Sequence, residues 1–287
     1  MFETGPAAQK IPRLPPLTDE LKKRVISALL LAPLGFSVAF FGGWFAVVIT
    51  TFVAMLILSE WNDVTSDGRA RGWFAFEIAV AAFTAIALIA RWEWVALLGL
   101  VAVACLTIFL ALRGSNAAWA TGGLIYALSL PLSIVILLNS ARWGFEAAVF
   151  ICFVIWTTDV FAYFAGKGIG GPKLWPAISP KKTWAGFIAG LTGGVIAGGV
   201  MSLILGLVWS LPLALLAFAL SLAGHGGDLY ESWVKRHFDK KDSGQLIPGH
   251  GGIMDRMDGL LAAFVVAMVV GVARGGLHDC AGGLLSW

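Results

Sequence analysis

Hydrophobic residues occur along most of the chain in long runs that charged residues rarely interrupt. A helix needs about 20 mostly apolar residues to cross about 30 Å of bilayer hydrocarbon. Runs of this length or somewhat shorter occupy residues 24–42, 43–61, 72–90, 93–112, 117–138, 143–165, 186–209, 211–226 and 259–273. The pattern therefore predicts an all-α polytopic membrane protein with about nine transmembrane helices, of which the eighth and ninth are short.

Composition and charge extend this prediction to orientation and organisation. Of the 287 residues, 59% are hydrophobic and only 13% are charged, which is far more apolar than a soluble domain. If the N-terminus is cytoplasmic, every Lys and Arg except Arg91, Arg142 and Arg274 falls on the cytoplasmic side, as the positive-inside rule requires. We expect a retained cytoplasmic tail at 1–23, an N-terminal transmembrane bundle at 24–140, and a second transmembrane half at 141–287.

Several classes of site are not supported by the sequence. Cys105, Cys152 and Cys280 are isolated, so we infer neither a disulfide framework nor a zinc site. The basic residues are dispersed among loops and no nucleic-acid motif is present, so the expected contact of the basic loops is with membrane lipid and not with nucleic acid. The sequence contains neither the P-loop motif G-x-x-x-x-G-K-[ST] nor a G-x-G-x-x-G motif that opens a helix after a strand. Any nucleotide must therefore bind to a site of another kind.

Most of the remaining polar residues lie in two predicted cytoplasmic loops, at 166–185 and 224–258. Just before the first loop, Asp159 interrupts the apolar run FVIWTTDVFAYFAG. A carboxylate in such a run is costly unless it has a partner, so Asp159 is a candidate for a functional site. The alternative is a structural acid that neighbouring polar side chains satisfy.

Carboxylates in the second loop have helical spacing. If the eighth helix continues past Gly227, then Asp228, Glu231 and Lys235 share one face, together with Ser232. Asp255 and Asp258 share a face in the same way where the ninth span begins. Carboxylates without a His or Cys cluster suit a hard cation such as Mg²⁺, and not zinc.

Basic residues surround these acids in both loops. Lysines and arginines interleaved with acids and glycines fit a metal-bridged polyphosphate, in which acids hold the metal and cations contact phosphate oxygens. Composition alone does not distinguish such a phosphate-binding site from a charged loop that is simply exposed to solvent. The basic residues are Lys167, Lys173, Lys181, Lys182, Lys235, Arg236, Lys240, Lys241 and Arg256.

A long motif narrows these alternatives. The segment SWVKRHFDKKDSGQLIPGHGGIMDRMD, at 232–258, resembles the signature of the phosphatidate cytidylyltransferases (CDP-diacylglycerol synthases) along its whole length. The matching positions are Ser232, Lys235, Arg236, Lys241, Asp242, Gly244, His250, Gly251, Gly252, Asp255, Arg256 and Asp258.

The resemblance continues upstream of this segment. The lead-in GDLYESWVKR carries Asp228 and Glu231, and 159–186 is similar to a second family loop. Its matching positions are Asp159, Tyr163, Gly166, Lys167, Lys173, Ser179, Pro180, Lys182 and Thr183. Ala185 departs from the family, since many relatives have Glu or Gln there.

The resemblance implies a nucleotidyltransferase of phospholipid biosynthesis. The phosphate of phosphatidic acid would attack the α-phosphorus of CTP, giving CDP-diacylglycerol and pyrophosphate. The resemblance also implies Mg²⁺ on Asp228 and Asp255, with a monovalent cation such as K⁺ in some members; from the residues we add Glu231 and Asp258 as candidate metal ligands. We expect the active-site recess near the cytoplasmic face of a bacterial inner (plasma) membrane, and the oligomeric state stays open, with a homodimer as one alternative.

The candidate residues divide into two groups beyond the metal ligands. The catalytic candidates are Asp228, Asp255, Lys235, Arg236, Lys241 and Arg256. The substrate-binding candidates are Asp159, Lys167, Lys173, Ser179, Lys182, Thr183, Ser232, His250, Gly251 and Gly252.

Two other functions are alternatives to the transferase. A CTP-dependent lipid kinase, such as a polyprenol kinase, would transfer the terminal phosphoryl group to an alcohol. A transporter would use Asp159 as an intramembrane acid, but the polar groups lie on one predicted side and the two halves show no matching pair of broken helices.

Overall fold

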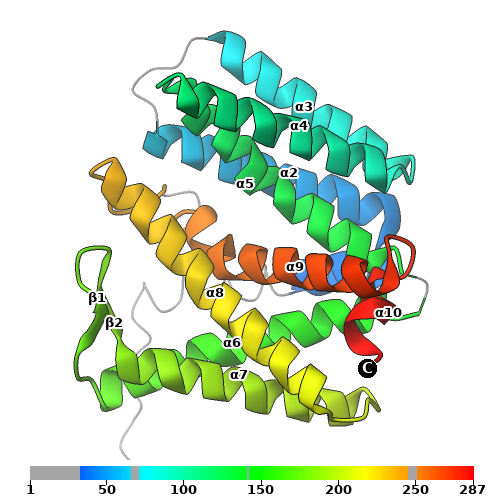
Figure 1. The fold of residues 1–287 in the computed structure, drawn as a ribbon, viewed down its shortest axis with the longest axis vertical. Helices are drawn as coiled ribbons and strands as arrows, with labels where there is room; N and C mark the ends of the chain where they lie inside the picture. The colour runs from blue at the N-terminus through cyan, green and yellow to red at the C-terminus, as the bar shows by residue number, and fades with distance from the viewer. Residues whose placement is uncertain (1–32, 66–70, 141, 245–250) are drawn as a thin grey trace, which may run out of the picture.

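The computed structural model describes residues 33–65, 71–140, 142–244 and 251–287, and in these ranges the chain is almost entirely helical (Figure 1). The only strands found there form one hairpin. The predicted tail at 1–23, the first part of the first predicted span and His250 lie outside the described residues. Positions 33–41, at the end of that first span, are helical.

Seven helices in the described ranges are long and apolar enough to cross a membrane. They are α2 (Gly43–Thr65), α4 (Glu93–Leu112), α5 (Ala117–Leu138), α6 (Gly144–Gly168), α7 (Trp184–Ile204), α8 (Leu211–His237) and α9 (Met254–Gly275). Two more helices are α3 (Arg71–Ile89), which holds the shorter apolar stretch Trp73–Ile89, and α10 (Cys280–Leu285). The fold class of an all-α polytopic membrane protein is confirmed, whereas the count of nine spans and their orientation stay predictions.

Two helices are longer than the hydropathy indicates. α8 has 27 residues and continues to His237, and α9 has 22 residues and begins at Met254. The sequence predicted short spans at 211–226 and 259–273, with a loop over all of 224–258. This is wrong for both helices, because α8 extends into the first part of the predicted loop and α9 begins within its last part. Hydropathy falls at Asp228 and Glu231, but a polar residue does not end a helix, and α8 continues there with the cations of Lys182 and Lys235 paired to these charges.

The predicted loop 166–185 contains a hairpin. β1 (Lys173–Trp175) pairs antiparallel with β2 (Ser179–Thr183), and Lys173 lies opposite Thr183. Thr183 then caps α7, since its Oγ1 accepts a hydrogen bond from the backbone N–H of Gly186 at 3.1 Å. The hairpin projects from one end of the α6 and α7 pair (Figure 1).

The two halves of the chain pack against each other in space. Figure 1 shows α2 to α5 on one side and α6 and α7 on the other, with α8 and α9 crossing between them. Trp61 of α2 stacks on Tyr126 of α5 and on Tyr230 of α8, with ring centroids 5.3 Å and 6.3 Å apart. Side chains of the N-terminal bundle are thus part of the surroundings of α8.

Glycines allow α8 and α9 to approach closely, as small residues do where membrane helices cross. A Cβ at Gly259 would lie 3.0 Å from the carbonyl oxygen of Gly224. A Cβ at Gly227 would overlap the carbonyl oxygen of Asp258. The backbones therefore meet beside Asp228, which follows Gly227, and Asp258, which precedes Gly259.

Gly227→Ala is expected to destabilise the protein by about 1–3 kcal/mol, because the added methyl group would force α8 and α9 apart. The matched control is Gly226→Ala, one residue earlier, where a Cβ would meet no heavy atom within 4 Å. Thermal unfolding midpoints of the two purified variants in detergent compare them. A midpoint for Gly227→Ala equal to or above that of the control would contradict the close contact.

Candidate active site

A cavity of about 820 Å³ opens between α6, α8, α9 and the hairpin. Its volume is within the range of small-molecule binding sites. The acids that line it are Asp159, Asp228, Glu231, Asp255 and Asp258, and the cations are Lys167, Lys181, Lys182, Lys235 and Arg256. Residues that are up to about 100 positions apart in the sequence thus share one polar cavity inside a largely apolar helix bundle.

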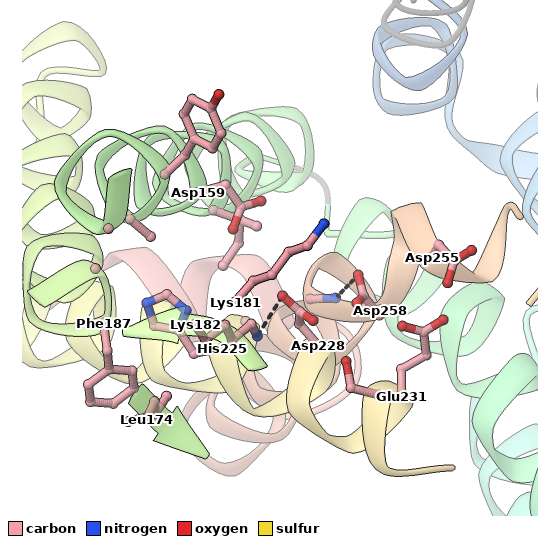
Figure 2. A pocket seen from close by; sticks show the side chains of 18 of the residues that line it. Asp159, Leu174, Lys181, Lys182, Phe187, His225, Asp228, Glu231, Asp255 and Asp258 are labelled. Atoms are coloured by element: carbon pink, nitrogen blue, oxygen red, sulfur yellow. Dashed lines mark hydrogen bonds and ion pairs between the residues drawn. The ribbon is translucent and has the colours of Figure 1, made fainter. Parts of the chain in front are cut away.

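Three of the carboxylates form a cluster. Oxygen atoms of Asp228, Glu231 and Asp258 all lie within 4.8 Å of one another. Asp228 and Glu231 are one turn apart on α8, and Asp258 approaches them from α9 at the close contact of the two helices (Figure 2). Cations nearby lower the cost of bringing such negative charges together.

Two lysines supply positive charge to the cluster. The Nζ of Lys182, from β2, lies 2.6 Å from Oδ2 of Asp228. Lys235 of α8 is buried, and its Nζ donates to Oε2 of Glu231 at 3.1 Å and also to Oδ1 of Asp255. Lys235 therefore links the first turn of α9 to α8, and the buried charges of Glu231 and Lys235 offset each other.

Asp255 is held by a different set of groups from the three clustered acids. Its Oδ2 accepts hydrogen bonds from the backbone N–H groups of Gly252 at 3.1 Å and Ser243 at 3.4 Å. Gly251 has a φ of +85°, a conformation that favours glycine, and this turn brings the chain back toward Asp255. The carboxylate also lies in the first turn of α9, where the helix dipole favours negative charge.

α6 presents a row of candidate residues to the cavity. Asp159, Tyr163, Gly166 and Lys167 follow one another at helical spacing, and all four line the cavity. Figure 2 shows Asp159 on α6 facing the space into which Lys181 extends from the hairpin. The side chains of Ser232 and Thr183 also border the cavity, although Thr183 is engaged as the cap of α7.

Some candidates lie away from the cavity. Of the residues that the structure describes, Lys173, Ser179, Arg236 and Lys241 do not line it. Arg236 instead donates to the carbonyl oxygen of Lys240 at 2.9 Å, at the end of α8. Gly251 and Gly252 shape the turn before α9, and His250 lies outside the described residues.

The cavity also includes residues that the sequence analysis did not assign to the site. Lys181 extends into the cavity. In the sequence, only its position beside Lys182, in a basic loop, could have indicated this role. His225 lines it from α8, and its ring packs against that of Phe187 of α7, with centroids 5.0 Å apart. A Cβ at Gly190 would lie 2.5 Å from Nε2 of His225, so the imidazole fills the space between α7 and α8.

Known proteins resemble this chain over most of its length. The model of the cytidylyltransferase family matches residues 22–273. A phosphatidate cytidylyltransferase of Brucella melitensis biotype 1 is 35% identical over 257 residues, which are 88% of this chain and 94% of that protein. Its namesake in Brucella abortus biovar 1 is 36% identical over the same shares of both chains.

Another relative matches over a shorter part of the chain. The phosphatidate cytidylyltransferase of Bacillus subtilis is 48% identical over 128 residues, which are 43% of this chain and 46% of that protein. The family match covers both helix groups and every described residue of the cavity. The chain belongs to the cytidylyltransferase family.

Proposed function

We propose that this chain is a phosphatidate cytidylyltransferase, which transfers the cytidylyl group of CTP to phosphatidic acid and releases pyrophosphate. The observation that carries the proposal is the single cavity in which clustered carboxylates face lysines and an arginine. A site of this kind suits a reaction between two phosphate-bearing molecules, whose negative charges must be neutralised before they can meet. The names of the relatives support the same reaction.

The reaction exchanges one phosphorus–oxygen bond for another. An oxygen of the lipid phosphate bonds to the α-phosphorus of CTP, while the bond from that phosphorus to the oxygen bridging the β-phosphorus breaks. The electron pair of the broken bond leaves with pyrophosphate. Because the attacking oxygen is already anionic near neutral pH, no side chain has to remove a proton, and catalysis consists of alignment and charge stabilisation.

The cations of the cavity divide into two roles in this proposal. Lys167, Lys181, Lys182 and Arg256 contact phosphate oxygens, since they reach the cavity from three different elements. Lys235 instead keeps α8 and α9 in register through Glu231 and Asp255. Lys173, Arg236 and Lys241 add positive charge from outside the cavity, where it attracts an anionic nucleotide.

The clustered carboxylates fit Mg²⁺. Their oxygen atoms lie within 4.8 Å of one another and no His or Cys joins them, which is the ligand chemistry that Mg²⁺ prefers. Asp228, Glu231 and Asp258 would hold the ion, and Asp255 borders the same cavity. When bound, Mg²⁺ would neutralise phosphate charge and ease the departure of pyrophosphate.

An apolar cavity next to the polar one supports a lipid substrate. The described residues enclose about 370 Å³ between positions 34–39 and helices α2, α5, α6 and α9. Both cavities are lined by Trp156, Arg256 and Leu260. An anionic headgroup beside Arg256 would therefore have apolar surface next to it for its acyl chains. From the seven long apolar helices and the bacterial relatives, we infer that the enzyme works in the inner (plasma) membrane of a bacterium.

The proposed reaction is tested with CTP labelled either in the cytosine ring or in the γ-phosphate. With phosphatidic acid and Mg²⁺, the purified protein is expected to transfer the cytosine label to the lipid and to release pyrophosphate in equal amount. Transfer of the γ-phosphate label alone would support a lipid kinase and contradict the proposal.

Asp228→Asn is expected to lower kcat by about 100-fold or more, because Asp228 is shared by the proposed metal site and the Lys182 ion pair. The same variant should lose the increase in thermal unfolding midpoint that Mg²⁺ gives the parent protein. Asp239→Asn is the matched control, since Asp239 is exposed beyond the end of α8 and its φ of +53° suits Asn. Equal activity of the two variants would refute the role of Asp228.

Lys182→Ala is expected to lower kcat/KM by about tenfold or more, since Asp228 loses the cation 2.6 Å away and the phosphates lose a contact. Lys173→Ala removes a lysine of the same hairpin that lies outside the cavity, and it should change kcat/KM by less than about threefold. Steady-state kinetics at several CTP concentrations compare the two. A larger effect of Lys173→Ala would mean that the hairpin binds substrate in another position.

A further inference from the structure

A buried carboxylate from the N-terminal bundle holds the start of α9. Glu60, near the end of α2, is 1% exposed. Its Oε1 accepts a hydrogen bond from the backbone N–H of Ile253 at 2.9 Å, and its Oε2 accepts one from Met254 at 2.8 Å. These N–H groups belong to the residue before α9 and to its first residue, so Glu60 satisfies donors that have no partner within the helix.

Glu60 also contacts the segment that precedes this helix. The hydroxyl of Ser243 donates to its Oε2 at 3.3 Å. A Cβ at Gly244 would lie 2.8 Å from Oε1 of Glu60, and a Cβ at Gly252 would lie 2.6 Å from Oε2. At these two glycines of the motif at 232–258, any larger side chain would therefore collide with this carboxylate.

The same segment binds Asp255. The backbone N–H groups of Ser243 and Gly252 both donate to Oδ2 of Asp255. Ser243 thus contacts both acids, through its hydroxyl to Glu60 and through its N–H to Asp255. Asp255 in turn accepts a hydrogen bond from Lys235. A shift of the Glu60 carboxylate would consequently move the donors that orient Asp255.

We infer that Glu60 is a positioning residue for the transferase: it holds Ser243, Gly252 and the start of α9 so that Asp255 and Lys235 keep their places in the cavity. Glu60 is not among the described residues that line this cavity, so it acts through its neighbours. The inference rests on the proposed function, in which Asp255 borders the cavity where the reaction takes place and Lys235 keeps α8 and α9 in register. A purely structural acid would affect stability but would leave the kcat of the folded molecules unchanged.

Glu60→Gln tests this role, because the amide keeps the size of the side chain but removes its charge and turns an N–H group toward a backbone donor. We expect kcat per folded molecule to fall by about 10- to 100-fold, the range found for residues that orient an active-site ligand. The KM values for CTP and phosphatidic acid should change by less than about threefold, because the phosphate-binding cations are not displaced.

Glu93→Gln is the matched control. Glu93 is also buried, at 5% exposed, and it accepts a hydrogen bond from Asn139 at 2.8 Å, but no contact is found between it and the described residues before α9, 242–244 and 251–253. Both variants replace the charged carboxylate of a buried side chain by an amide of the same size, although Glu93→Gln also weakens an ion pair with the exposed Arg91, 3.7 Å away. The kcat of Glu93→Gln per folded molecule is expected to stay within about twofold of that of the parent protein, even if its thermal unfolding midpoint is lower.

Gly244→Ala disturbs the same contact without removing the charge. The heavy atoms that its Cβ would approach most closely all belong to Glu60. We expect kcat to fall by about three- to tenfold, and the double variant with Glu60→Gln to have the kcat of Glu60→Gln alone. Such non-additivity is the sign that two changes act through one interaction.

A kcat for Glu60→Gln within about twofold of the parent would overturn the inference, as would an equal loss in Glu93→Gln. If Glu60→Gln does not fold, Gly244→Ala decides in the same way: a lowered kcat with unchanged KM supports the inference, and an unchanged kcat overturns it. A parent protein that forms no CDP-diacylglycerol would instead overturn the proposed function, so the two failures are distinguishable.

Discussion

The close contact of α8 and α9 is the constraint on which the polar cavity depends. The two backbones meet at Gly224, Gly227 and Gly259, and this approach places Asp258 against Asp228 and Glu231. Three carboxylates at this separation repel one another, and their charges are costly to bury among apolar helices. Lys182 and Lys235 offset this cost from the hairpin and from α8 itself. The helix contact brings the acids together, and the charge pairing offsets the cost of that approach.

The N-terminal bundle contributes more than an apolar surface to this arrangement. Trp61 stacks against aromatic rings of α5 and α8, and the adjacent Glu60 accepts hydrogen bonds from the start of α9. A single turn of α2 therefore contacts both helices that carry the clustered acids. The helix start needs an acceptor because its first N–H groups have no partner within the helix, and the buried Glu60 supplies one where solvent does not reach.

The arrangement of polar and apolar space suits a reaction at a membrane boundary. A soluble nucleotide needs cations and oxygen ligands, whereas a lipid needs apolar surface within reach of the same atoms. The polar cavity and the apolar cavity share Trp156, Arg256 and Leu260, so one cation lies where the two kinds of surface join. The hairpin adds Lys181 and Lys182 from the other side (Figure 2). The proposed mechanism requires no further chemical group from the chain, because its two reactants bring the nucleophile and the leaving group.

The amino-acid sequence by itself determined the helical membrane class, since long apolar runs have few other stable structures in a bilayer. It also indicated the acids of α8 and α9, because spacings of three and four place residues on one face of any helix. Tertiary structure alone decided that Asp258 joins Asp228 and Glu231, that Asp255 pairs with Lys235, and that Lys173 and Ser179 lie outside the cavity. It likewise decided where α8 and α9 end and what Glu60 contacts. The physical reason is that these outcomes depend on the distances between separate helices, which set charge pairing and burial, and spacing along one chain does not specify them.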